Sequence, residues 1–259
     1  MKNHKTNFRQ WNKDIFIQSV KKINFNIIWM IILDGLFYLI AGYIASSWFQ
    51  SVQLKGRAYL QDIESLGYTE AHQLSNQAQP FFFWIISSFV IIIILIILLE
   101  SIFKGIIWMR MSGKKINIKL LSKFFLVNII WAGFWLLALF AATRIVDDQN
   151  IVSFAAGILI AAFYLTNALY TMFMESQSFR SIPESIKLSI SNFHIFLLPY
   201  ICFFIGLISI GWIFGLAASA YSGTISSVVL FIYATALLAY SAFARYYFST
   251  LVLEIIKSK

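Results

Sequence analysis

Residues Pro80–Leu99 read PFFFWIISSFVIIIILIILL, and this stretch decides the class of fold. It carries no charge, and its only polar side chains are those of Ser87 and Ser88. At a rise of ~1.5 Å per residue, a helix of this length spans ~30 Å, the thickness of the hydrocarbon core of a bilayer. A helix that is apolar on every side has no water-facing surface to offer in a soluble domain. The stretch therefore predicts a membrane-spanning helix.

The composition of the whole chain agrees with a membrane protein. Of its 259 residues, 60% are hydrophobic and 12% are charged, against about 25% charged residues in a typical soluble domain. The net charge of +9 would indicate nucleic-acid binding in a soluble protein. Here the Lys and Arg residues cluster beside apolar segments, as membrane topology requires, so we expect no nucleic-acid partner. The only cysteine, Cys202, lies within an apolar segment and indicates no disulfide, redox or metal site.

Six apolar segments are long enough to cross a bilayer, so we predict an all-α, polytopic membrane protein with one domain over residues 1–259. The segments are roughly Ile27–Phe49, Phe81–Phe103, Phe124–Ile145, Ile151–Met174, Phe193–Ala218 and Ile225–Val252. The order of the segments predicts three helical hairpins, the last of them closed by a tight turn at Ser219–Thr224.

The distribution of cationic residues predicts the orientation of the chain. Seventeen of the 20 Lys and Arg residues fall in the N-terminal tail, in the connections after the second and fourth segments, and at the C-terminal end. Lys55, Arg57 and Arg144 fall on the other side. Because cytoplasmic connections carry the excess of Lys and Arg, this asymmetry predicts that both termini face the cytoplasm of a cell membrane.

The connection at residues 50–79 is the long one on the outer side. Apolar residues recur in its first half at helical spacing, Gly67 is typical of a helix stop, and Thr69 followed by Glu70 is typical of a restart. We predict two short helices that lie over the outer face of the membrane domain.

The segments also look like a threefold repeat. The tetrapeptide Asn-Ile-Ile-Trp occurs at residues 26–29 and again at residues 128–131, each time where a segment leaves the cytoplasm. We predict that a short surface helix precedes each outgoing segment. The stretches concerned are residues 15–22, 116–123 and 186–190. The alternative is chance similarity among short segments that are rich in apolar residues, Asn and Lys.

Two local patterns accompany this layout. Ser181-Ile182-Pro183-Glu184 fits a capping box with Ser181 as N-cap, which predicts the start of the third surface helix. The segments that return to the cytoplasmic side each end with an acidic residue, and a basic residue follows it a few positions later. Glu100 and Lys104 are four residues apart, and such pairs attract each other weakly on a helix surface.

The lead-ins Trp11–Lys22 and Ser181–Asn192, before paired spans in a six-span chain, resemble the glycerophosphodiester-phosphodiesterase membrane-domain-like proteins and related uncharacterised six-span families. The resemblance covers most of the chain as architecture and includes no signature motif. In the named family the catalytic work belongs to a separate soluble domain, which this sequence lacks. The resemblance therefore implies a membrane module and transfers no functional residue.

Asp34 is the strongest candidate for a functional residue within the membrane. It lies eight residues past Asn26, which is ~12 Å into the bilayer at the helical rise. An ionised carboxylate at such a depth costs at least about 2.5–3.5 kcal/mol. Arg245, at a similar depth in the sixth segment, is the predicted partner. The alternatives are a neutral Asp34 bonded to Ser, Thr or Tyr while Arg245 snorkels to the headgroups, or a solute or proton site at Asp34.

Other candidates are packing and interfacial groups. Asn128 and His194 are predicted at the cytoplasmic interface, where water or lipid headgroups satisfy them, and Asn167 is predicted to bond across helices. Small residues four apart in the fifth segment predict close helix packing within the monomer, with a homodimer interface as the alternative. These are Gly211, Gly215 and Ser219. Three lysines are predicted to contact anionic lipid headgroups. These are Lys114, Lys115 and Lys119.

No enzyme signature occurs in the chain. It has no Gly-x-Ser-x-Gly, no His-Glu-x-x-His and no Gly-rich loop ending in Lys-Ser/Thr, so we predict no catalysis, no cofactor and no metal. The favoured function is a non-catalytic membrane module that organises lipid or protein partners, with a homo-oligomer as a further partner option. The alternative is a small transporter or channel with a polar path near Asp34, Asn167 and Arg245. An intramembrane enzyme ranks third.

Overall fold

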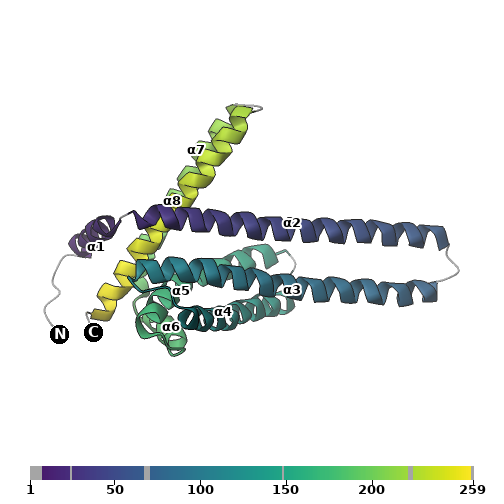
Figure 1. The fold of residues 1–259 in the computed structure, drawn as a ribbon, viewed down its shortest axis with the longest axis horizontal. Helices are drawn as coiled ribbons and strands as arrows, with labels where there is room; N and C mark the ends of the chain where they lie inside the picture. Colours follow the sequence, from purple (N-terminus) through teal and green to yellow (C-terminus); the bar gives the residue numbers. More distant parts are fainter. Residues whose placement is uncertain (1–7, 24, 67–70, 148, 221–223, 258–259) are drawn as a thin grey trace.

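The computed structural model describes residues 8–23, 25–66, 71–147, 149–220 and 224–257 (Figure 1). These residues form helices joined by short turns, and no strand occurs among them. The helices are α1 (Phe8–Lys22), α2 (Asn26–Leu66), α3 (Ala71–Met111), α4 (Ile118–Ile145), α5 (Ile151–Ser176), α6 (Ser181–Ser191), α7 (Phe193–Ala220) and α8 (Thr224–Lys257). The predicted all-α class is confirmed for this part of the chain.

Six of the described helices are long and apolar enough to cross a membrane, and each contains one of the predicted segments. These are α2, α3, α4, α5, α7 and α8. Large apolar side chains stay exposed along them, for example Leu39, Phe83, Leu137 and Phe231. Apolar surface on this scale needs an apolar solvent, so the structure supports a multi-pass membrane protein.

Helices α2 and α3 are longer than their predicted segments, because each runs for 41 residues. Residues 50–66 continue α2 and residues 71–79 begin α3, so the structure differs from the predicted outer loop with two separate short helices. The predicted stop at Gly67 and the restart after it lie outside the described residues. Figure 1 shows α2 and α3 side by side, projecting beyond the other helices, while α7 leads away from them in another direction.

Contacts between the extension of α2 and the first residues of the predicted second segment on α3 explain why α2 continues. The rings of Tyr59 and Phe81 are stacked with their centroids 5.4 Å apart. The Lys55 Nζ atom lies 3.6 Å from the centroid of the Trp84 ring, which is a cation–π contact. Since the α2 extension has α3 to pack against, it does not need to fold down as a separate surface helix.

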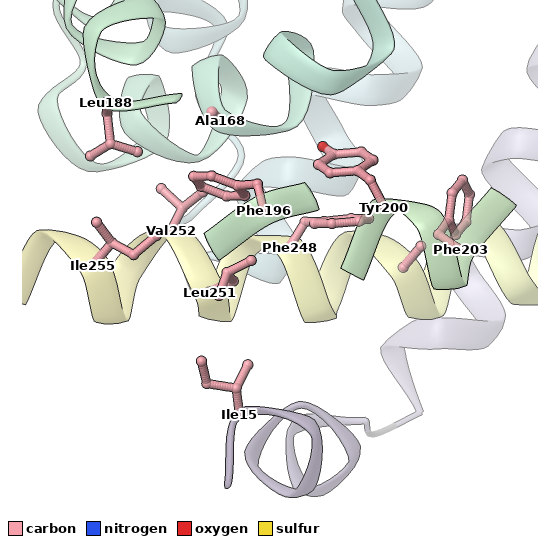
Figure 2. Packing of buried hydrophobic residues seen from close by; sticks show 11 residues of the cluster. Ile15, Ala168, Leu188, Phe196, Tyr200, Phe203, Phe248, Leu251, Val252 and Ile255 are labelled. Atoms are coloured by element: carbon pink, nitrogen blue, oxygen red, sulfur yellow. The ribbon is translucent and has the colours of Figure 1, made fainter. Parts of the chain in front are cut away.

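The short helices α1 and α6 each pack on a spanning helix, α1 on α8 and α6 on α5. In Figure 2, Ile15 of α1 points toward Leu251 of α8, and both side chains are buried. The Lys22 Nζ atom donates a hydrogen bond of 3.2 Å to Thr250 Oγ1. Burial against α8, together with the positive charge of Lys257, lowers the pKa of Lys22.

The second predicted surface stretch, residues 116–123, is not a separate helix. Asn117 lies immediately before α4, and its side chain accepts a hydrogen bond of 2.9 Å from the Lys119 backbone N–H, as an N-cap residue does. Most of the stretch therefore forms the first turns of the spanning helix α4. The threefold repeat stays a prediction, and its second unit has no surface helix of its own.

The start of α6 also differs from the prediction. Arg180 is the N-cap residue and makes no side-chain capping bond. The hydroxyl group of Ser181 instead donates a hydrogen bond of 2.8 Å to the Ser178 carbonyl oxygen. The predicted capping box is wrong because Ser181 is the first residue of the helix and not its N-cap.

The close approach between α7 and α8 is at Gly206 rather than at the predicted small residues. A Cβ atom at Gly206 would overlap the ring of Tyr240, whose hydroxyl group donates a hydrogen bond of 3.3 Å to the Phe203 carbonyl oxygen. A Cβ atom at Gly211 would have Tyr233 Oη as its nearest neighbour at 3.7 Å, and one at Gly215 would meet no described atom within 4 Å. Among the described residues no close neighbour lies at Gly215, and the predicted packing there stays a prediction. The side chain of Ser219 lies outside the described residues, and the homodimer alternative stays a prediction.

Candidate functional site

Three charged side chains from three helices meet inside the bundle. Asp34 of α2 is fully buried, with 0% of its surface exposed. The Lys104 Nζ atom of α3 donates a hydrogen bond of 2.6 Å to Asp34 Oδ1. The Arg245 Nη1 atom of α8 lies 2.6 Å from Asp34 Oδ2. Neither Nη1 nor Oδ2 makes a hydrogen bond with the described residues, so this second contact is an ion pair without hydrogen-bond alignment.

The helix directions explain why these residues meet. Helix α2 leaves the end of the bundle where α1 and the last residues of α8 lie, the side of the termini, and α3 and α8 return to it (Figure 1). Asp34 lies eight residues after the first residue of α2, and Lys104 lies seven residues before the last residue of α3. At the helical rise these offsets correspond to ~12 Å and ~10 Å, so both side chains reach the same layer.

The structure brings together the predicted residues Asp34 and Arg245 and adds Lys104, which the sequence analysis had assigned to a cytoplasmic connection. The expected attraction between Glu100 and Lys104 is present, but it lies inside the bundle and not on a helix surface, because Lys104 is buried and donates to Asp34. A signal for this was present: the apolar sequence continues past Lys104 through Ile106–Met109, so the span extends beyond the lysine. The depth of Lys104 could have been inferred from that run.

A cavity of about 190 Å³ lies beside the ion pairs. Its walls come from four helices, and contacts of α2 with α3, α3 with α5, α5 with α8 and α8 with α2 close them into a ring. The charged residues of the wall are Glu100, Lys104 and Arg245, whereas Asp34 does not line the cavity. The remaining lining residues are Tyr38, Trp108, Phe163, Thr166, Asn167, Tyr170, Ser241 and Ala244.

The residues that line the cavity are more exposed at one end than at the other. Tyr38 is 56% exposed and Phe163 is 40% exposed, and both lie on the side away from the chain termini. Trp108 is 1% exposed and Tyr170 is 5% exposed, and they lie on the side of the termini with their rings in edge contact at 5.7 Å. Beyond them lies a packed layer that includes the fully buried Phe173. The cavity is therefore blocked toward the termini.

Neutral polar groups near the cavity are mostly satisfied across helices. The Asn167 Nδ2 atom donates a hydrogen bond of 3.3 Å to Tyr200 Oη on α7, as predicted for a deep amide. Asn128 is buried and donates a hydrogen bond of 2.8 Å to Ser101 Oγ on α3, so its predicted place at the interface is wrong. His194 is exposed near the start of α7, and its interfacial position stays a prediction.

The other predicted contact residues lie away from this site. Lys115 and Lys119 are exposed and Lys114 is half-buried, around the turn before α4. Within the described part of the chain, no three His, Cys, Asp or Glu side chains come together as a group that could hold a metal ion. The chemistry available at the cavity is therefore charge pairing and hydrogen bonding by side chains.

No protein-family model, no curated protein and no solved structure matches this chain.

The ion pairs lead to a stability prediction. Asp34→Ala leaves two buried cations without their counter-charge, and we expect it to lower the free energy of unfolding by about 3–5 kcal/mol. Arg245→Ala should also destabilise the protein, since it leaves Asp34 with one partner. The double variant, Asp34→Ala with Arg245→Ala, should lose clearly less free energy of unfolding than the two single variants together. The reason is that the charges of Lys104 and Glu100 then balance each other. Detergent-induced unfolding of the purified protein measures all four states of this cycle.

A matched control is the pair Glu254 and Lys257 at the end of α8, where Nζ and Oε1 lie 3.1 Å apart and the lysine side chain is 71% exposed. The coupling free energy between Glu254 and Lys257, measured by the same double-mutant cycle, should not exceed about 0.5 kcal/mol, because solvent screens exposed ion pairs. Equal coupling in the two cycles, or simple additivity at Asp34 and Arg245, would contradict the buried pairing.

Proposed function

We propose that this protein is a multi-pass integral membrane protein that binds a small anionic solute in the central cavity and moves it across the bilayer. One observation carries the proposal: Lys104 and Arg245 line the cavity, while Asp34, the carboxylate that holds them, lies behind the wall. The geometry thus favours the transporter alternative over the module that the sequence favoured.

The charge of the wall supports an anionic solute. The cavity surface carries two cations and one carboxylate, that of Glu100, while the second carboxylate, Asp34, lies behind the wall. The four groups carry no net formal charge when all are ionised, but cations outnumber carboxylates on the surface that faces the cavity. An ammonium group has three donors and a guanidinium group has five, so Asp34 does not use up either side chain. Arg is especially suited to carboxylate and phosphate groups, which it binds through two parallel hydrogen bonds. Thr166 and Asn167 add neutral polar groups beside them.

The unequal exposure of the two ends of the cavity supports transport rather than a permanently open channel. Transporters expose a site near the middle of the membrane to one side at a time. Here the blocked side carries Trp108 and Tyr170, and the exposed side carries Tyr38 and Phe163. We infer that this conformation receives solute from the side opposite the chain termini. Release on the other side then requires the packed layer that contains Trp108 and Tyr170 to open.

The sequence-based module remains the second candidate, and one surface supports it. Lys115 and Lys119 are exposed next to Ile116 and Ile118, which are themselves exposed at 50% and 82%. Large apolar side chains beside lysines suit a membrane interface, where the lysines contact anionic headgroups. In this second proposal the chain is a non-catalytic member of a six-span family, three hairpins with amphipathic surface helices, that organises lipid or protein partners.

Both proposals share one orientation: a cell-membrane protein with its N-terminus and C-terminus in the cytoplasm. The excess of Lys and Arg at the ends of the helices on the side of the termini supports it. A protease added to intact cells should leave a tag at either terminus uncut, and the same protease should remove it from inside-out vesicles. Cleavage in intact cells would contradict the orientation.

Binding of an anion tests the transport proposal directly. We expect inorganic phosphate, succinate or glutamate to raise the melting temperature of the purified protein in detergent above the level that potassium chloride of equal ionic strength gives. Glutamine, the neutral analogue of glutamate, should have no such effect. Glu100→Gln should strengthen binding by severalfold, because it removes the negative charge from the wall without breaking either contact of Asp34.

Glu175→Gln, at an exposed position near the end of α5, is the matched control and should leave anion binding unchanged. If none of the three anions stabilises the protein beyond the salt control, or if Glu100→Gln and Glu175→Gln behave alike, the anionic-solute proposal is wrong.

A further inference from the structure

A second cavity lies outside the four-helix ring, between α1, α7 and α8. Its volume is about 400 Å³, within the range of about 300–1,000 Å³ that is typical of ligand pockets. Its wall is almost entirely apolar and rich in aromatic rings, including those of Phe16, Phe203, Tyr240 and Phe243. Lys13 is the one charged residue among the described residues that line it.

The cavity is elongated along the helices. Its lining residues on α8 run from Tyr240 to Phe248, which is ~12 Å at the helical rise. At one end lie Asn12 and Lys13 of α1, and the Tyr247 hydroxyl group donates a hydrogen bond of 3.3 Å to Asn12 Oδ1, which fixes α1 at this end. At the other end lies Tyr240, one turn deeper in the span than Ala244. The polar end therefore faces the surface and the apolar end faces the membrane interior.

The exposed residues of α1 indicate which part of the membrane surrounds the polar end of this cavity. Ile15 is buried against α8, but Phe16, Ile17 and Val20 on the same short helix are exposed. A helix with exposed apolar residues and lysines belongs in the interface between acyl chains and headgroups. Lys13 then lies at headgroup depth, and it makes no hydrogen bond or ion pair with the described residues. The cation is available to a ligand from the membrane.

We propose that this cavity holds one acyl chain of an anionic glycerophospholipid, with the lipid phosphate and headgroup at Lys13. The elongated cavity has room for a single acyl chain, and its aromatic wall suits a hydrocarbon. The positive charge of Lys13 at the polar end is complementary to an anionic headgroup. A lipid seated there contacts α1, α7 and α8 together and stabilises α1 on the bundle. The site does not depend on solute binding in the central cavity.

The experiment uses the full chain and its single cysteine. Cys202 lines the cavity and is exposed, so N-ethylmaleimide can fill part of the cavity in the folded protein. Delipidated protein in detergent is mixed with phosphatidylglycerol or with phosphatidylcholine of identical acyl chains, and native mass spectrometry counts the lipids retained. We expect one phosphatidylglycerol molecule to be retained in preference to phosphatidylcholine, and alkylation of Cys202 to abolish its retention.

Two matched controls separate this site from general lipid binding. Lys13→Gln should reduce the preference for phosphatidylglycerol about fivefold, which corresponds to ~1 kcal/mol for a lysine near an anionic surface. Lys115→Gln, which removes an exposed lysine from the turn before α4, should leave the preference unchanged. In a Cys202→Ser background, alkylation of Leu39→Cys, at an exposed position on α2, should not affect lipid retention.

The proposal is overturned if the lipid is still retained after alkylation of Cys202, or if Lys13→Gln and Lys115→Gln change lipid retention equally. It is also overturned if phosphatidylcholine or oleate is retained to the same extent as phosphatidylglycerol. These outcomes are independent of those for anion binding at the central cavity, since Lys13 and Cys202 do not line that cavity.

Discussion

An ionised carboxylate inside a membrane domain must have a counter-charge, and this constraint organises the bundle around Asp34. Its two carboxylate oxygens are approached by Lys104 and Arg245 at 2.6 Å each. Because the three residues belong to α2, α3 and α8, the ion pairs join the start of the first span to the ends of the second and the last. The low dielectric surroundings that make an unpaired charge costly also make these contacts strong.

The same arrangement creates the functional surface. One carboxylate holds two cations, so the cations retain donors and a positive charge that Asp34 does not cancel. Both cations are turned toward the central cavity, and the carboxylate is not. With Glu100 in the wall, the site holds two cations and two carboxylates. What distinguishes this site from a simple ion pair is that both cations line a cavity and Asp34 does not.

Much of the fold follows from sequence because lipid demands long uncharged segments, and six of them are visible in the chain. Depth arithmetic along two helices was also enough to pair Asp34 with Arg245. Lys104 was missed because positive charges were used as markers of the membrane surface, whereas a lysine with a buried partner can lie deeper. The cavity itself could not be predicted, since it depends on how four helices close into a ring.

Other differences have local physical causes. Contacts between aromatic residues of α2 and α3 keep the residues beyond the spans helical, and a periodic pattern cannot reveal such partners in advance. Spacing of small residues predicted close packing at Gly215, but the approach is at Gly206, where the Tyr240 ring covers the backbone. Which of several glycines faces a neighbour depends on helix rotation, and the spacing does not determine it.

The central claim, that Asp34 is ionised within the membrane domain, is tested most directly by infrared spectroscopy. The protein is reconstituted in lipid at neutral pH with isotope-labelled aspartate side chains, and the spectrum of Asp34→Asn is subtracted from that of the unaltered chain. Paired with two cations, Asp34 should contribute to the carboxylate stretching band, and the difference should appear there. A difference in the carbonyl band of a protonated carboxylic acid would contradict the account.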